Sequence, residues 1–283
     1  MGIRILVTGS RGFIGRHVVA SAQGRTDEIV EWDADVRDLA KCNEPADVVF
    51  HLAAASRYDQ FNDVPHESYA TNVVGTAAAL NYCSRVGARC ILTSTSAVYR
   101  PPDGTRPVPE DAAVRPTSVY GISKWLAERL CHQQARDAGV VSTVLRLFNV
   151  YGPGQHPSFL VPYVVQCLKE RRPIFLRMPE GIRDFVYVAD VVDALFKAAR
   201  LSNQGIKVFN IGSGRAVRVQ DMIRVAERVF GQAVAVEEAA VHPDEIAAVV
   251  ADTSQARDEL GWTAIYDLEA GLIAMRNEYK TTE

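Results

Sequence analysis

The sequence predicts an α/β fold in which a doubly wound parallel sheet is followed by a smaller, mixed C-terminal lobe. Short runs rich in Val, Ile and Leu alternate with helical patterns through the first half of the chain, and these runs show little alternation with polar residues. Such runs are typical of parallel strands that helices cover on both faces. The expected strands are residues 3–7, 29–32, 47–52, 89–93 and 141–148.

The first expected strand leads through a glycine-rich turn into a helical pattern. Gly9 permits a tight turn, Gly12 lets the backbone approach a pyrophosphate, and Gly15 lets the helix pack closely. The amides at the start of the helix then face an anion. Glycines with this spacing also occur in ordinary turns. Their place at the first strand-to-helix connection favours a Rossmann domain that binds a dinucleotide.

The later elements divide the chain into two parts. We expect the dinucleotide-binding domain at residues 1–150 and the substrate lobe at residues 151–283, because a Gly-Pro-Gly sequence follows Tyr151 and the later elements are shorter. Residues 190–212 open with a well-patterned helix and are expected to pack back on the sheet. The remaining expectations are a proline-rich loop beside the site at residues 100–116 and helices at 67–86, 117–138 and 159–171.

Composition and charge favour a cytoplasmic protein that binds small molecules. The formal net charge of −3 and the lack of long runs of like charge argue against nucleic acid or a membrane surface as partners. The five cysteines are odd in number and show no C-x-x-C spacing, so neither disulfides nor a metal site are expected. The sequence contains no recognisable leader segment and no run of about 18 apolar residues.

Tyr120 and Lys124 stand four residues apart on the helix expected at residues 117–138, so they share one face of it. A phenol near an ammonium group loses its proton more readily. We therefore expect Lys124 to lower the pKa of Tyr120 from its usual value of about 10 toward working pH. Tyr120 would then act as a general acid or base. The alternative is an exposed Tyr and Lys on a helix surface, but their combination with the glycine turn favours catalysis.

Four hydroxyl-bearing residues, 93–96, follow a central strand at the carboxyl edge of the expected sheet. Open α/β folds bind ligands at this edge. A hydroxyl group there could hydrogen-bond a reacting oxygen, whereas the alternative is that these side chains cap the next turn.

Further motifs follow one another along nearly the whole chain. They are VVFHLAA (48–54), TNVVGT (71–76), STSAVY (94–99), YGISK (120–124), RLFNVYGPG (146–154), RDFVYV (183–188), FNIGSG (209–214) and LGW (260–262). Together with the glycine turn, these motifs resemble the extended short-chain dehydrogenase/reductase family, specifically its NAD-dependent sugar-nucleotide epimerase and dehydratase branch. So many ordered matches make an accidental similarity very improbable.

The resemblance implies a catalytic set of Thr95, Tyr120 and Lys124. Thr95 would hold the sugar oxygen, Tyr120 would move its proton, and Lys124 would also bind the nicotinamide ribose. The expected cofactor-binding residues are Gly9, Arg11, Gly12, Phe13, Ile14, Gly15, Asp33, Asp35, Val36, Leu52, Ala53, Ala54, Asn72, Thr93, Tyr120 and Lys124.

The same resemblance assigns substrate binding to Ser96, Asn149 and Arg183. Asn149 and Arg183 match positions that grip the substrate nucleotide and its phosphates, and a planar guanidinium suits an anion of that kind. A surface ion pair between Arg183 and Asp184 is the alternative interpretation.

The identity of the cofactor depends on two charged residues. Asp33 ends the second expected strand, where an acidic side chain accepts hydrogen bonds from the adenine ribose and repels a 2′-phosphate, so NAD is favoured. Arg11 argues the other way, because a cation there could pair with a 2′-phosphate, and NADP remains an option. Asp35 and Val36 resemble the family's adenine-contacting segment, although the connection from Asp33 is unusually short.

Two departures from the family pattern limit the choice of reaction and substrate. Dehydratases of this branch carry an Asp-Glu pair after the catalytic threonine. This chain has Ser96 and Ala97 instead, which disfavours dehydration. His242 stands where the family has a phosphate-binding arginine, so an atypical substrate is expected. Either Arg177 or Arg215 compensates for that loss, or His242 is an ordinary loop residue.

These observations give one leading hypothesis and two rivals. The leading one is a nucleotide-sugar 4-epimerase, an isomerase that transiently oxidises C4 of a nucleotide-diphosphate sugar with bound NAD. One rival is an NAD(P)H-dependent reductase of a nucleotide-linked 4-keto (deoxy)sugar, and the other is an NAD(P)-sensing binding protein without turnover. As in similar proteins, the helices expected at residues 67–86 and 117–138 would pair in a homodimer.

Overall fold

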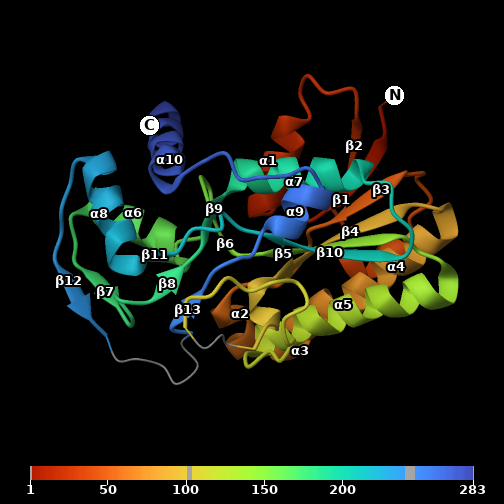
Figure 1. Cartoon of the computed structure of the whole chain (residues 1–283). Coiled ribbons are helices and arrows are strands. Elements are labelled where there is room, and N and C mark those ends of the chain that lie inside the picture. The colour runs from red at the N-terminus through yellow and green to blue at the C-terminus, as the bar shows by residue number, and fades with distance from the viewer. Residues whose placement is uncertain (1, 101–103, 240–245, 283) are drawn as a thin grey trace.

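The computed structural model describes residues 2–100, 104–239 and 246–282, and its centre is a sheet of six parallel strands (Figure 1). The strand order is β10-β5-β4-β3-β1-β2, so the sheet grows in opposite directions from β1. The expected doubly wound parallel sheet is confirmed. Its strands are β1 (Arg4–Thr8), β2 (Glu28–Trp32), β3 (Val48–His51), β4 (Arg89–Thr95), β5 (Ser142–Leu147) and β10 (Ile206–Ile211).

Helices cover both faces of this sheet (Figure 1). Side chains that alternate along the strands pack on opposite faces, because successive residues of a strand point to opposite sides. Ile5 and Phe50 belong to the apolar cluster with α1 and α7, while Leu6 and Val49 belong to the cluster with α4 and α5. The covering helices are α1 (Phe13–Ser21), α7 (Val188–Arg200) and α9 (Ser254–Glu259) on one face, and α4 (Gly75–Val86) and α5 (Val119–Ala138) on the other.

The connection from β2 to β3 is short. It contains one 3₁₀ helix, η1 (Val36–Lys41), and β2 lies at the edge of the sheet. The side chain of Val36 is 5% exposed and packs beneath Gly75 at the start of α4. This contact joins the 3₁₀ helix to the start of α4.

The helix expected at residues 67–86 is interrupted by a π turn. It begins as α3 (Pro65–Tyr69), passes through η2 (Ala70–Val74) and continues as α4. A short helix, α2 (Tyr58–Asp63), precedes it. π turns within helices are frequent at functional sites, and this one places Asn72 against the loop that follows β3.

The second lobe lies beside the carboxyl ends of the sheet strands (Figure 1). It has its own apolar cluster, which includes Val164, Met222 and Leu272. Both α7 and β10 return to the sheet, whereas the division at residue 151 stays a prediction. The lobe contains α6 (Leu160–Glu170), α8 (Val219–Phe230), α10 (Leu268–Thr282), and the strands β6 (Asn149–Tyr151), β7 (Ile174–Leu176), β8 (Ile182–Arg183), β9 (Phe185–Tyr187), β11 (Val217–Arg218), β12 (Val236–Glu238) and β13 (Ala248–Val249).

The described part of the expected proline-rich loop, residue 100 and residues 104–116, is irregular, and residues 101–103 lie outside the described residues. Residues 104–116 contain no helix. Two isolated β-bridges connect this segment to the rest of the structure, one between Tyr99 and Val114 and one between Val108 and Ala251. Within the ranges that the structure describes, no helix combines the length and the apolar character needed to span a bilayer.

Candidate active site

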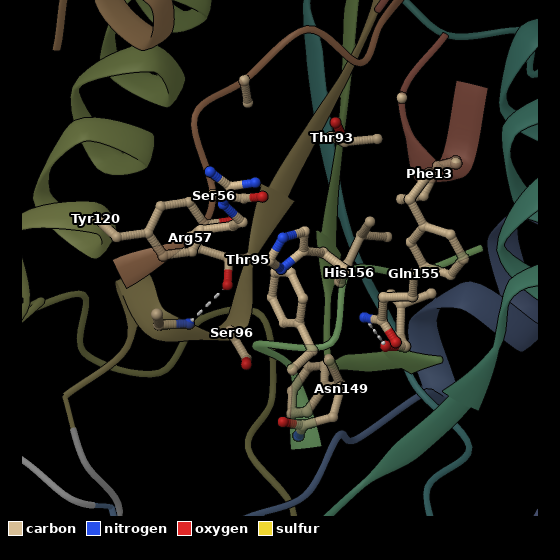
Figure 2. Close-up of a pocket in the computed structure, with 18 of the residues that line it drawn as sticks. Phe13, Ser56, Arg57, Thr93, Thr95, Ser96, Tyr120, Asn149, Gln155 and His156 are labelled. Atoms are coloured by element: carbon tan, nitrogen blue, oxygen red, sulfur yellow. Dashed lines mark hydrogen bonds between the residues drawn. The ribbon is translucent and has the colours of Figure 1, made fainter. Parts of the chain in front are cut away.

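A cavity of about 1020 Å³ opens at the carboxyl ends of β1, β3, β4 and β5 and extends to the second lobe. Gly9, Leu52, Thr95 and Leu147 line it from the ends of these four strands. Its position beside the strand at which the sheet reverses its order is where open α/β sheets bind ligands. Figure 2 shows the side chains that surround it.

The glycine turn forms one side of this cavity and leaves no room for side chains. Gly9 has a left-handed φ of 69°, and a Cβ atom there would lie 2.7 Å from the amide nitrogen of Ala53. A Cβ atom on Gly15 would lie 2.1 Å from the carbonyl oxygen of Gly9. Helix α1 starts at Phe13, directly after Gly12. Its first amides therefore face the cavity, an arrangement that suits a phosphate group.

Asp33 follows β2 and is held by two residues of the glycine turn. The Arg11 guanidinium donates a hydrogen bond to Oδ2 of Asp33 at 2.7 Å, and the Ser10 hydroxyl donates to Oδ1 at 3.2 Å. Arg11 is therefore paired with the acidic residue that favours NAD.

Thr95, Tyr120 and Lys124 meet at the cavity. Thr95 ends β4, and its Oγ1 accepts a hydrogen bond from the amide of Ala97 at 3.2 Å. Tyr120 and Lys124 lie in the first turns of α5, which begins after the N-cap Ser118. Lys124 is only 3% exposed.

The structure contradicts the expectation that Lys124 lowers the pKa of Tyr120. Burial raises the pKa of Tyr120 to about 12, although the hydrogen bond with Thr95 acts in the opposite direction. Burial also lowers the pKa of Lys124 to about 8, while the carboxylate of Glu128 acts to raise it. The phenolate and the ammonium both lose hydration inside the protein. This loss outweighs the attraction expected from their spacing on the helix.

Asn72 links the loop after β3 to helix α5. Its Nδ2 donates hydrogen bonds to the carbonyl of Ala55 at 3.0 Å and to Oγ of Ser123 at 2.9 Å, and its Oδ1 accepts from the amide of Ala55 at 2.8 Å. The Ser123 hydroxyl donates in turn to the carbonyl of Tyr120 at 2.7 Å. This network fixes the loop relative to the first turn of α5.

The three expected substrate residues all line the cavity. Ser96 lies beside Thr95, and Asn149 and Arg183 come from the second lobe side. Asp184 is fully buried, and its carboxylate accepts hydrogen bonds from Ser213, Gly214 and Ala251. These contacts argue against the interpretation of Asp184 as a surface partner of Arg183.

Most of the expected cofactor residues line the cavity, but six do not. The residues that line it are Gly9, Gly12, Phe13, Ile14, Gly15, Leu52, Ala54, Thr93, Tyr120 and Lys124. The six that lie outside its lining are Arg11, Asp33, Asp35, Val36, Ala53 and Asn72.

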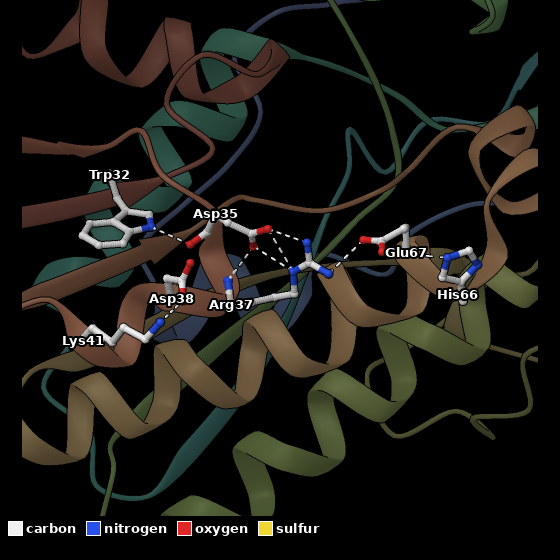
Figure 3. Close-up of polar contacts among 7 residues, drawn as sticks. All are labelled: Trp32, Asp35, Arg37, Asp38, Lys41, His66 and Glu67. Carbon is white, nitrogen blue, oxygen red and sulfur yellow. Dashed lines mark hydrogen bonds and ion pairs between the residues drawn. The ribbon is translucent and has the colours of Figure 1, made fainter.

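Asp35 and Val36 lie at the start of η1, outside the cavity lining. Asp35 caps the 3₁₀ helix η1, and its carboxylate accepts hydrogen bonds from the amide and the guanidinium of Arg37 (Figure 3). Arg37 also lowers the pKa of Asp35 and donates to the carboxylate of Glu67 at 2.8 Å. Asp35, Arg37 and Glu67 therefore link η1 to α3, and the expected contact of Asp35 and Val36 with adenine stays a prediction.

The structure does not test the expectation for the position at which the family has a phosphate-binding arginine. His242 lies outside the described residues, and the two candidate replacements, Arg177 and Arg215, are exposed and do not line the cavity.

Sequence reasoning missed several residues of the cavity, including Arg16, Ser56, Arg57, Gln155 and His156. Two signals were available. Ser56 and Arg57 follow the motif at residues 48–54 after one intervening residue, in the loop after a strand, and His156 is the second residue after the Gly-Pro-Gly break. Polar residues in such loops face the ligand side of an open α/β sheet.

The cavity fits a dinucleotide, because the glycine turn offers backbone amides where any side chain would clash and a buried lysine faces the reaction end. The model of the NAD dependent epimerase/dehydratase family matches residues 5–212. The chain belongs to this family. It is therefore an enzyme whose cofactor is NAD, and its place in the epimerase and dehydratase branch is confirmed.

Similar proteins act on nucleotide sugars. A UDP-glucose 4-epimerase of Azospirillum brasilense is 30% identical, over 95% of this chain and 90% of its own length. A UDP-glucuronic acid decarboxylase of Arabidopsis thaliana is 28% identical, over 98% of this chain and 70% of its own length. Among solved structures, MoeE5 with UDP-glucuronic acid and NAD has a TM-score of 0.90 and 30% identity, and the match covers 99% of this chain and 100% of that chain.

Proposed function

We propose that the protein is a nucleotide-sugar 4-epimerase. The observation that carries the proposal is the meeting of Thr95, Tyr120 and Lys124 at the carboxyl edge of the sheet, beside a glycine turn that admits only backbone. Ser96 and Ala97 follow Thr95 without a carboxylate, so the pair that would eliminate water is missing there. The 4-epimerases and decarboxylases among the similar proteins support a nucleotide-sugar substrate.

The reaction removes the proton of the C4 hydroxyl group and the hydride of C4, and then returns the hydride to the opposite face of C4 and the proton to the oxygen. NAD supplies the hydride acceptor and, in its oxidised form, a positive charge that favours a nearby phenolate. The Tyr120 oxygen takes the proton from the C4 hydroxyl and later gives it back. Thr95 forms a hydrogen bond with the C4 oxygen of the sugar and orients it. The net redox change is zero.

Burial assigns a resting state to the acid-base pair. With its pKa at about 12, Tyr120 holds its proton until a positive charge lies close to it. Lys124 has a pKa of about 8 and is the buried cation on the same helix. A bound oxidised nicotinamide would add a positive charge near the phenol, which would favour the phenolate form that Tyr120 needs to accept the substrate proton.

Substitution of Tyr120 tests this function. In the Tyr120→Phe variant, turnover should fall by about 10³-fold while NAD affinity stays within about twofold of the parent, because one proton-transfer group is lost and packing is kept. Exchange at C4 of UDP-glucose and UDP-glucuronic acid is followed by NMR, and NAD affinity by calorimetry. Tyr266→Phe, in the second lobe, is the matched control.

Other outcomes would identify the rivals. Net consumption of NADH or NADPH with a nucleotide-linked 4-keto sugar would identify a reductase. Tight NAD binding without turnover of any nucleotide sugar would favour a binding protein.

We also propose that α4 and α5 form a homodimer interface. Val74 directly precedes α4, and Val119 and Leu126 lie on α5; all three are exposed apolar side chains on neighbouring helices. Sedimentation should give twice the chain mass, and Leu126→Lys should shift it to the monomer. A parent protein that sediments as a monomer would contradict this assembly.

A further inference from the structure

We propose that His51 is a positioning residue for the catalytic site, because its ring joins a chain of hydrogen bonds that ends at Tyr120. The chain starts in the loop after β3, passes through the ring and the π turn η2, and reaches the first turn of α5. His51 is 2% exposed and lies outside the cavity lining. It therefore acts through other residues, and this role is separate from the proton transfer proposed for Tyr120.

The ring of His51 connects the ends of two sheet strands to helix α4. Its Nδ1 lies 2.9 Å from the hydroxyl of Thr8, which ends β1, and its Nε2 lies 2.9 Å from the hydroxyl of Thr76 in the first turn of α4. All three side chains are at most 2% exposed. Because buried donors and acceptors need partners, the protons of this cluster must be arranged consistently.

Two backbone groups fix the direction of these bonds. The amide of Ala53 donates to Oγ1 of Thr8 at 3.2 Å, and the Thr76 hydroxyl donates to the carbonyl of Asn72 at 2.6 Å. An amide N–H only donates and a carbonyl only accepts. The Thr76 oxygen therefore accepts from Nε2 of His51, and the Thr8 hydroxyl donates to Nδ1. His51 is thus the neutral tautomer that carries its proton on Nε2.

The surroundings keep this ring neutral. A charged ring would also carry a proton on Nδ1 and would leave the Thr8 hydroxyl without its acceptor. Burial lowers the pKa of His51 to about 3, and the nearby cation of Lys124 acts in the same direction. The chain therefore keeps one arrangement of protons near neutral pH.

The chain continues through Asn72 to the catalytic tyrosine. Nδ2 of Asn72 donates to Oγ of Ser123 at 2.9 Å, and the Ser123 hydroxyl donates to the carbonyl of Tyr120 at 2.7 Å. Oδ1 of Asn72 accepts from the amide of Ala55, which fixes the orientation of its side-chain amide. Every bond of the chain thus points the same way, from the amide of Ala53 to the carbonyl of Tyr120.

A chain with one direction holds the active site in one arrangement. Hydrogen bonds that run head to tail polarise and strengthen one another. The chain begins in the loop whose Leu52 and Ala54 line the cavity, and it ends at the first turn of α5. The placement of the Tyr120 side chain relative to a bound sugar therefore depends on a ring that lies outside the cavity.

The tautomer of His51 gives the first test, and this test needs no turnover. Long-range ¹H–¹⁵N NMR of the enzyme labelled in its histidine rings distinguishes the two neutral tautomers from the charged ring. We expect a signal that is lost in His51→Gln, shows the proton on Nε2 and stays unchanged from about pH 8 to about pH 6. A proton on Nδ1, or titration near the ordinary pKa of about 6.5, would overturn the proposal.

Substitution of Thr76 tests the positioning role. Thr76→Val has a similar shape but lacks the hydroxyl that joins the ring to the π turn. At saturating NAD⁺, kcat should fall about 10-fold to 100-fold while KM for the nucleotide sugar stays within about threefold, because the catalytic groups are displaced and the binding groups are kept. Thr76→Ser, which keeps the hydroxyl, should restore most of the turnover.

Thr143→Val is the matched control. Thr143 is a fully buried threonine of β5 in the same sheet, and its hydroxyl has no hydrogen-bond partner among the described residues. This variant should turn over like the parent. Equal losses in Thr143→Val and Thr76→Val, or no rescue by Thr76→Ser, would overturn the positioning role, since packing would then explain the effect. Thr8→Val breaks the chain independently if Thr76→Val fails to fold.

Hydrogen exchange follows the chain without any reaction. In Thr76→Val, amide exchange of residues 122–126 should quicken at least about tenfold relative to the amides of α6, because the first turn of α5 loses its connection to the π turn. Parent-like exchange at these residues would overturn the proposal.

These measurements keep the chain and the proposed function apart. Exchange at C4 of UDP-glucose by a parent enzyme whose His51 carries its proton on Nδ1 would remove the chain and keep the epimerase. The expected tautomer and the expected change in amide exchange, in a protein that converts no nucleotide sugar, would keep the chain and remove the epimerase.

Discussion

On one side of the cavity, backbone segments lie so close together that no side chain fits between them, whereas the other side is lined by polar side chains from distant segments of the chain. The glycine-turn side consists of residues 9–16, in which a Cβ atom on Gly15 would meet backbone at 2.1 Å. The sugar side consists of Ser56, Arg57, Ser96, His156 and Arg183, which come from separate loops and strands.

This difference indicates which properties each side controls. A close backbone contact admits one residue type, so the glycine-turn side specifies the class of cofactor and tolerates little change. The sugar side uses side chains on loops, which can be exchanged without disturbing the sheet. The choice of sugar therefore depends on residues whose replacement should alter preference more than stability.

The largest expected effect comes from adding a side chain to a glycine of the glycine-turn side. Gly15→Ala should lower NAD affinity by at least about 100-fold and reduce the free energy of unfolding by about 1–3 kcal/mol, because the backbone of Gly9 and Ser10 has no room to move. Calorimetry and urea unfolding measure the two quantities. Gly139→Ala is the control: its Cβ meets no atom, so NAD affinity should be kept despite the strain at φ 67°. Parent-like NAD binding by Gly15→Ala would refute the steric account.

The second largest expected effect is a dependence of the free energy of unfolding on pH, which arises from a histidine beneath the glycine turn. His51 lies beneath the glycine turn, between the hydroxyls of Thr8 and Thr76, each 2.9 Å from a ring nitrogen. Burial lowers its pKa to about 3. The folded state therefore binds fewer protons than the unfolded state between about pH 6.5 and pH 3, and stability falls as pH falls through this range.

From pH 7 to pH 5, His51 should account for a loss of about 2 kcal/mol in the free energy of unfolding. Urea unfolding of the parent and of His51→Gln at both pH values measures this difference, and effects of other titrating groups cancel in the comparison. The same pH dependence in the parent and His51→Gln would contradict the assignment.

The smallest expected effect concerns cofactor choice. Asp33→Asn should shift the ratio of NADP to NAD affinity by about tenfold, because it removes a negative charge near the expected 2′-phosphate and releases Arg11 from its 2.7 Å ion pair. Calorimetry with both cofactors measures the ratio. A second substitution, Arg11→Gln, should cancel most of the gain, and an unchanged gain would mean that Arg11 takes no part.

Much of the fold and part of the site could be predicted from the sequence because they depend on neighbours along the chain. The strand, turn and helix around Gly9 and Gly15 involve few residues, and the apolar runs of the sheet strands identify their type. The shared helix face of Tyr120 and Lys124 follows from helix geometry alone. The observed bounds of the helices and strands differ from the expected ones by a few residues. The π turn near Asn72 could not be recognised from the pattern of apolar residues.

The expectation that was wrong concerns a property that depends on the whole fold. The pKa of Tyr120 could not be predicted from a nearby lysine, because the loss of hydration depends on everything packed around the phenol. The expected contact of Asp35 with adenine stays a prediction, and in the structure its carboxylate accepts hydrogen bonds from Arg37.

The sequence by itself determined the sheet, the glycine turn and the family, because local geometry restricts which residues can stand at each position. Only the tertiary structure brought Arg57 and His156, about a hundred residues apart, to opposite walls of one cavity that lacks a described acidic residue. Which distant side chains share a cavity depends on how loops pack against the sheet, and packing over such distances leaves no periodic signal in the chain.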